Sequence, residues 1–150
     1  MSLLLEIVAE HPDVADALHE GLERVSSRLD ERIASDLLAV QDLVAHIERY
    51  RGKMFRPAVA LLSGMAASPR AGEASPASLI REEHITIAAV IEMIHLATLV
   101  HDDVLDEADV RRQGATVNRL RGNEAAVILG DYLISKAFHL CSTLSKQTSA

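Results

Sequence analysis

The sequence predicts an all-α protein. Strand signals are nearly absent, since there is no sustained alternation of apolar and polar residues and no Asn-Gly or Asp-Gly hairpin turn. Apolar residues instead recur at intervals of three and four along most of the chain. Hydrophobic residues make up 49% of the 150 residues, which is enough for the core of one domain.

The first three helices are expected in the N-terminal part of the chain. Apolar residues step by three and four from residue 18 to residue 33, after Pro12 and with Asp13 as the expected cap. Ser35 is expected to cap a second helix. Pro57 suits the first turn of a third helix.

Two longer helices are expected in the second half. Residues 67–78 are rich in Ala, Ser, Pro and Gly and predict a linker, and residues 107–121 predict a polar loop. Between them a long apolar helix runs from about Arg81 to Asp106, and a final helix starts near Asn123, its expected cap. Acids and histidines interrupt the apolar helix before the ~18 uncharged residues of a membrane span. We therefore expect a buried helix and no transmembrane segment.

Composition excludes several classes of function. Fifteen Lys and Arg against 22 Asp and Glu give a net charge of −7, and aromatic residues are only 3%. An acidic, aromatic-poor chain is poorly suited to neutralising phosphates or stacking bases, so we expect no nucleic-acid partner. The single cysteine, Cys141, cannot form an internal disulfide, which predicts a cytoplasmic protein.

The strongest chemical signal is the acidic run at residues 102–106. Asp102 and Asp106 are one helical turn apart, so their carboxylates can share Mg²⁺ with substrate phosphates. Glu92, His95 and Leu99 fall on the same helix face, within a sector of roughly 80°. Polar groups on an apolar helix are costly unless paired or ligated, which favours a site over a solvated helix end.

Two basic groups accompany these acids. Arg111 and Arg112 follow the acidic run, and arginine is suited to bidentate phosphate contacts. Lys53 and Arg56 lie at the expected start of the third helix, where free N–H groups attract anions. Each group alone is at least as well explained by a solvated charge pair. Together with the acids they predict a site for a diphosphate on an apolar tail.

In this order the motifs resemble those of the trans-polyprenyl diphosphate synthases. The resemblance rests on residues 52–57 (the family's GKxxRP), His95, residues 102–106 (its first DDxxD motif) and the pair Arg111-Arg112. Residues 122–124 and 130–132 also resemble the family's next helix. The resemblance extends from about Leu18 onward. It implies an isoprenoid synthase type helical bundle, of which residues 1–150 form the N-terminal half.

The resemblance also implies an activity. The family members are Mg²⁺-dependent prenyltransferases of isoprenoid biosynthesis, which join isopentenyl diphosphate to an allylic diphosphate primer and lengthen it by one isoprene unit. Asp102 and Asp106 would hold Mg²⁺ on the primer's diphosphate, with Asp103 beside them and Arg111 on that same diphosphate. The expected ligands of isopentenyl diphosphate are the basic residues Lys53, Arg56, His95 and Arg112. A homodimer is implied as well.

Product length is the finest inference from the resemblance. In the family, residues one turn before the first DDxxD motif line the product tunnel, and bulky aromatic residues there stop elongation early. Ala97 and Thr98 are small, and Ile94, one turn deeper, is moderately bulky. The resemblance therefore implies a longer product than farnesyl diphosphate, of the kind that forms quinone side chains.

The family's second Asp-rich motif does not occur in these 150 residues, so we expect this chain alone to be inactive or nearly so. The chain could be part of a full synthase, a subunit of a two-chain synthase, or a non-catalytic protein that keeps the family's helices. A different chemistry, that of an HD-type metal phosphohydrolase, would use His101-Asp102 as a metal dyad. Its further ligands would be His84 or His95, with Asp131, and it leaves the basic residues unexplained.

Overall fold

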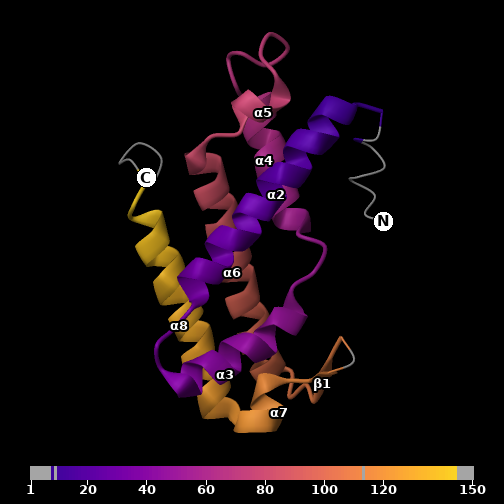
Figure 1. Cartoon of the computed structure of the whole chain (residues 1–150). Helices are drawn as coiled ribbons and strands as arrows, with labels where there is room; N and C mark the ends of the chain where they lie inside the picture. Colours follow the sequence, from indigo (N-terminus) through magenta and orange to yellow (C-terminus); the bar gives the residue numbers. More distant parts are fainter. Residues whose placement is uncertain (1–7, 9, 113, 145–150) are drawn as a thin grey trace.

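A computed structural model describes residue 8 and residues 10–112 and 114–144. Over these residues the chain is a bundle of helices with one short hairpin, which confirms the predicted fold class (Figure 1). The helices are α2 (Pro12–Ile33), α3 (Leu38–Ile47), the 3₁₀ helix η1 (Glu48–Tyr50), α4 (Phe55–Ala66), α5 (Pro76–Leu79), α6 (Glu82–Leu105), α7 (Val117–Arg121) and α8 (Asn123–Cys141). The strands β1 (Val110–Arg111) and β2 (Gly114–Ala115) pair antiparallel between α6 and α7.

Helix α6 is the centre of the bundle. It lies antiparallel to α8, and α2 and α4 pack on it from other sides (Figure 1). Small residues allow the close approach of α8: a Cβ atom on Gly130 would lie only 2.0 Å from Nε2 of His101. The core of α6 is fully buried and includes Ile85, Met93, Leu96, Ala97 and Val100. The acidic motif at its C-terminal end is therefore carried by the most firmly packed element of the fold.

The apolar character of α6 comes from this central position. Among the described residues it is the one helix long and apolar enough to cross a membrane, with a mean hydropathy of 1.5 over its best 18-residue window. Half of that window is buried inside the protein. This burial is what a core helix of a helical bundle shows, and it supports the expectation of a buried helix.

The expected helix caps are wrong. Asp13, Ser35 and Asn123 do not cap their helices, because the cap positions are occupied by His11, Leu37 and Gly122 without any side-chain cap bond. Asp13 lies inside the first turn of α2, where its charge still favours the helix dipole. By contrast, Pro57 lies in the first turn of α4 as expected.

The stretches expected to be irregular contain short elements. Residues 107–121, predicted as a loop, form the β1–β2 hairpin and α7, and the linker ends in α5. Arg112 takes a left-handed backbone conformation (φ 46°) directly after β1, the conformation that tight hairpin turns require. This turn lacks the Asn-Gly or Asp-Gly signal, which is why the sequence did not predict it.

Candidate functional site

The acidic motif ends α6 with two carboxylates open to solvent. Asp102 and Asp106 are both exposed, and the backbone N–H of Asp106 donates to the Asp102 carbonyl at 2.8 Å, which keeps them one turn apart. The described residues contain no group of three or more His, Cys, Asp or Glu that could hold a metal ion. Two carboxylates fit a hard cation such as Mg²⁺ when a ligand diphosphate supplies further oxygens.

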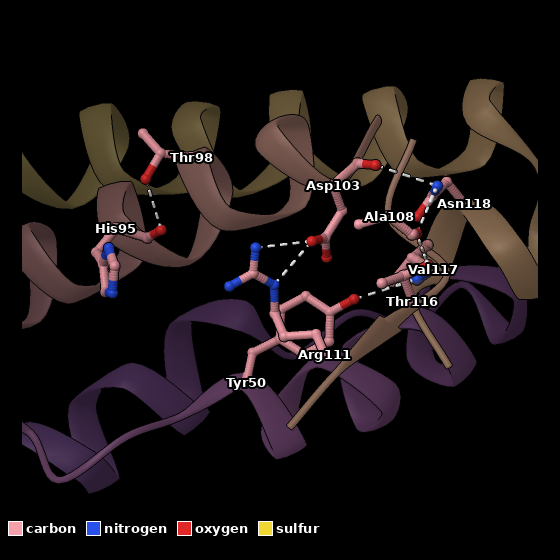
Figure 2. Close-up of polar contacts among 9 residues, drawn as sticks. All are labelled: Tyr50, His95, Thr98, Asp103, Ala108, Arg111, Thr116, Val117 and Asn118. Atoms are coloured by element: carbon pink, nitrogen blue, oxygen red, sulfur yellow. Dashed lines mark hydrogen bonds and ion pairs between the residues drawn. The ribbon is translucent and has the colours of Figure 1, made fainter. Parts of the chain in front are cut away.

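Asp103 faces the opposite way and is buried. Its Oδ1 atom accepts two bonds from Arg111, from Nε at 2.8 Å and from Nη2 at 2.7 Å (Figure 2). Its other oxygen, Oδ2, is buried without a hydrogen-bond partner. The middle aspartate of the motif therefore holds Arg111, whose expected partner was the diphosphate, and leaves Asp102 and Asp106 as the outward pair.

Side chains of Thr116 and Asn118 form hydrogen bonds with the backbone at the C-terminal end of α6. The Asn118 amide donates to the backbone carbonyls of Asp103 (3.2 Å) and Ala108 (3.1 Å). The Thr116 hydroxyl donates to the Ala108 carbonyl at 2.6 Å. The Asp103 carbonyl also accepts from the Ala108 N–H at 2.9 Å, so these bonds tie the last turn of α6 to the segment that follows it. They also fix the direction in which the chain continues toward Arg111 and Arg112.

The basic segment 52–57 meets this turn from the other side. The Arg112 guanidinium donates to the Arg51 carbonyl at 2.6 Å and covers Gly52, where a Cβ atom would lie 2.8 Å from Nη2 of Arg112. Lys53 and Arg56 are exposed at the start of α4. The close approach of the Arg112 guanidinium thus favours glycine at position 52, because a methyl group there would displace that side chain.

Backbone strain gathers around the same place. Among the described residues, the non-glycine residues with positive φ are Met54 (51°), Glu107 (49°) and Arg112 (46°). Each such conformation costs on the order of 1–3 kcal/mol and persists only where the surroundings impose it. Met54 lies inside the basic segment, Glu107 directly follows the acidic motif, and Arg112 directly follows β1.

His95 and Glu92 lie on α6 close to the basic residues of the site and precede its acidic motif. Burial lowers the pKa of the half-buried His95, and neighbouring positive charges lower it further; these are Arg56, Arg112 and Arg111. Burial also raises the pKa of Glu92, which is 3% exposed, against the opposing effect of nearby arginines. The fold therefore brings Arg56, His95 and Arg112 together, three of the four residues expected to bind isopentenyl diphosphate.

Tyr50 is the residue of this site that the sequence did not single out. It is 2% exposed, its hydroxyl accepts a bond from the Val117 backbone N–H at 3.2 Å, and its ring centroid lies 5.8 Å from the Arg111 guanidinium carbon (Figure 2). With two Tyr and two Phe in the chain, an aromatic residue directly before a basic motif was the available signal.

The burial of Tyr50 predicts a loss of stability at alkaline pH. Burial is the main cause that raises its pKa to about 12 from 10.0, and the Asp103 carboxylate adds to it, while the Val117 N–H and Arg111 oppose it. Because the unfolded chain releases this proton near pH 10, stability should fall between about pH 10 and 12 by up to ~1.4 kcal/mol per pH unit. Urea denaturation in this window should show a weaker pH dependence for Tyr50→Phe, and equal slopes would contradict the assignment.

Comparison with known proteins decides the family. The family model for polyprenyl synthetase matches residues 38–150. The chain belongs to the polyprenyl synthetase family. It is 40% identical over 125 residues to octaprenyl diphosphate synthase of Escherichia coli, and the match covers 83% of this chain and 36% of that relative. It is 38% identical over 134 residues to nonaprenyl diphosphate synthase of Mycobacterium tuberculosis, covering 89% and 37%.

Solved structures place the fold in the same group. A decaprenyl diphosphate synthase from Rhodobacter capsulatus superposes with a TM-score of 0.67 at 33% identity, covering 89% of this chain and 38% of that one. A polyprenyl synthase from Caulobacter crescentus, complexed with calcium and isoprenyl diphosphate, gives a TM-score of 0.73 at 26% identity, covering 91% and 39%. The chain thus spans well under half the length of the synthases it matches.

The residues expected to govern product length do not share one environment in this polyprenyl synthetase chain. Ala97 is fully buried in the packing of α6, whereas Ile94 is 43% exposed. Thr98, one turn after Ile94, is exposed, and its hydroxyl donates to the His95 carbonyl at 2.8 Å (Figure 2). Ile94 and Thr98 therefore form an open face of α6, and Ala97 belongs to the core.

The phosphohydrolase alternative is wrong. Family membership assigns a different chemistry, and His101 turns away from the acidic pair toward α8, where its Nε2 lies 3.3 Å from the Val127 carbonyl and 3.7 Å from Oδ1 of Asp131. His84 packs over Gly64 near the other end of α6, beside Arg81. These histidines therefore serve packing, and the HD dyad does not form.

Gly52→Ala should weaken anion binding without unfolding the polyprenyl synthetase chain. The new methyl group would displace the end of the flexible Arg112 side chain, so the loss falls on one charge-assisted contact, about tenfold in affinity. Calorimetric titration with inorganic pyrophosphate measures it. Gly114→Ala is the matched control, because its Cβ would meet the Arg111 carbonyl at an ordinary 3.7 Å. Equal affinities for the two variants would contradict this role for Gly52.

Proposed function

We propose that this chain supplies the first Asp-rich motif of an Mg²⁺-dependent trans-polyprenyl diphosphate synthase. Such an enzyme condenses isopentenyl diphosphate with an allylic diphosphate to make a longer-chain product. The observation that carries the proposal is that the outward carboxylate pair at the C-terminal end of α6, Asp102 and Asp106, lies near His95 of the same helix, beside which Arg56 and Arg112 gather from α4 and the hairpin. The long-chain relatives reported above support the type of product.

Each side of the site has a separate task in this proposal. Asp102 and Asp106 hold Mg²⁺ against the allylic diphosphate; when bound, the metal supplies positive charge that stabilises the departing diphosphate. Lys53, Arg56 and Arg112 hold the diphosphate of isopentenyl diphosphate. His95, whose pKa is lowered by burial and by the neighbouring arginines, can donate a hydrogen bond to a diphosphate oxygen.

Elongation then requires the part of the fold that the relatives have and that these 150 residues do not provide. Residues 1–150 are one half-site in this proposal, inactive or nearly so alone. The other half is supplied by further sequence or by a second chain. Homodimerisation and a cytoplasmic location belong to the same proposal and rest on the resemblance and on the unpaired Cys141.

A chimera tests the proposal. The matching 125 residues of the Escherichia coli octaprenyl diphosphate synthase are replaced by those of this chain. The purified chimera is expected to elongate farnesyl diphosphate with isopentenyl diphosphate only when Mg²⁺ is present. A folded chimera without elongation would favour a non-catalytic role for this segment.

The open face of α6 yields a prediction about product length. In the active chimera, Thr98→Phe should shift the product distribution to shorter chains, because a ring on this face would block the path of the growing tail. Ala97→Phe should instead destabilise the fold by about 1–3 kcal/mol, since position 97 is fully buried. Product analysis by chromatography checks the first expectation, and an unchanged chain length for Thr98→Phe would refute it.

A further inference from the structure

Tyr50 lies where the basic segment, the acidic motif and the hairpin meet. It ends η1, immediately before the segment 51–57. Its ring faces the Arg111 guanidinium of β1, and His46 of α3 packs edge-on against it with ring centroids 6.2 Å apart. Its hydroxyl reaches the first residue of α7, Val117. No step of the proposed reaction uses this side chain.

Within the part of the chain that the structure describes, two hydrogen-bonding groups at Tyr50 have no partner: the proton of its own hydroxyl and the Oδ2 atom of Asp103. The hydroxyl oxygen accepts from the Val117 N–H, so its own proton is free to be donated. Both Arg111 bonds go to Oδ1 of Asp103, and Oδ2 is buried with no partner. Figure 2 shows the Tyr50 hydroxyl beside the Asp103 carboxylate, and Asp103 adds to the burial that raises the pKa of Tyr50. A buried carboxylate oxygen and a phenol whose proton is free to be donated thus lie side by side.

We infer that Tyr50 is a positioning residue, whose ring and hydroxyl hold the Arg111–Asp103 ion pair and thereby fix the acidic end of α6 relative to the basic segment 52–57. The inference rests on the proposed function and adds a residue to it that does not touch the ligand. Arg111 acts with Tyr50 as part of this support, and Arg112, one residue later, is the arginine directed to the basic segment.

The two tyrosines of the chain allow a matched test. The Tyr132 hydroxyl is bonded to the backbone as well, as a donor to the carbonyls of Ile33 (3.2 Å) and Ala34 (3.0 Å), and it lies away from the acidic motif. Tyr50→Phe, Tyr50→Leu and Tyr132→Phe are titrated with inorganic pyrophosphate in the presence of Mg²⁺, at a temperature where circular dichroism shows each variant folded.

The expected result separates support of the site from support of the fold. Tyr50→Phe should bind Mg²⁺–pyrophosphate about tenfold more weakly, as changes behind a ligand shell do, and Tyr50→Leu more weakly still because the ring is lost as well. Tyr132→Phe should remain within about twofold of the unmodified chain, although both Phe variants lose a hydroxyl that is hydrogen-bonded to the backbone. Equal affinities for Tyr50→Phe and Tyr132→Phe would overturn the inference.

A second measurement does not depend on ligand binding. The Nε–H of Arg111 donates to Asp103, so its NMR signal should be protected from exchange with water. This protection should persist in Tyr132→Phe and be lost in Tyr50→Leu. Protection that survives in Tyr50→Leu overturns the role of Tyr50. Absence of Mg²⁺–pyrophosphate binding by the unmodified chain would instead refute the proposed function.

Discussion

Replacing Asp102 or Asp106 by Ala should lower the affinity of this chain for Mg²⁺–pyrophosphate by more than about 100-fold, beyond the 10–100-fold cost of outer-shell changes at metal sites. The two carboxylates are the exposed pair that ends α6, and a site with so few protein oxygens cannot lose one and keep its metal. Titration calorimetry with pyrophosphate at fixed Mg²⁺ measures the loss.

The control for this experiment carries the same change of charge. Glu107 is exposed and follows the motif directly, so Glu107→Ala removes one negative charge without removing a proposed ligand. Its affinity should stay within about threefold of the unmodified chain, because an exposed charge that does not coordinate the metal contributes little. A similar loss in all three variants would mean that net charge, and not coordination, governs binding.

The second large effect concerns stability. Asp103→Ala removes the buried partner of Arg111 and should lower the free energy of unfolding by about 3 kcal/mol, the lower end for breaking a buried pair, since the Arg111 side chain is 26% exposed. For a chain of this size that corresponds to a fall in Tm of roughly 10 °C. Thermal denaturation followed by circular dichroism measures it.

A double-mutant cycle identifies the cause of that loss. Arg111→Ala alone should also destabilise the fold, because it leaves the Asp103 carboxylate buried and unpaired. The double variant should lose less than the sum of the two single losses. Strictly additive losses would show that Asp103 and Arg111 stabilise the chain independently, contrary to the ion pair described here.

The sequence predicted the helical fold because the spacing of apolar residues along a helix is visible in residues that are close together in the chain. Spacings of three and four fixed the long helices, and α6 begins and ends within one residue of the expected bounds. The expected caps were wrong because these helices begin at residues that make no side-chain cap bond, and the segment around the hairpin was missed because it depends on partners outside the local sequence. Thr116 and Asn118, for example, bind carbonyls eight or more residues earlier in the chain.

The site was predicted in part for the same reason. Motif order identified both charged groups, and the fold gathers Arg56, His95 and Arg112 beside the acids. Sequence spacing does not reveal which of two adjacent aspartates turns inward, so the ion pair between Asp103 and Arg111 was not foreseen, and the expected contact of Arg111 with a diphosphate stays a prediction. Tyr50 was missed because its neighbours Asp103 and Arg111 are 53 and 61 positions away, and its place before a basic motif does not by itself indicate a contact with them.

The central claim is that Asp102 and Asp106 form a metal-dependent diphosphate site on this chain. The most direct test is a calorimetric titration of the 150-residue chain with farnesyl diphosphate, once with Mg²⁺ and once with a chelator. We expect binding with Mg²⁺ and its loss in the chelator. Equal binding under both conditions, or no binding under either, would contradict the claim.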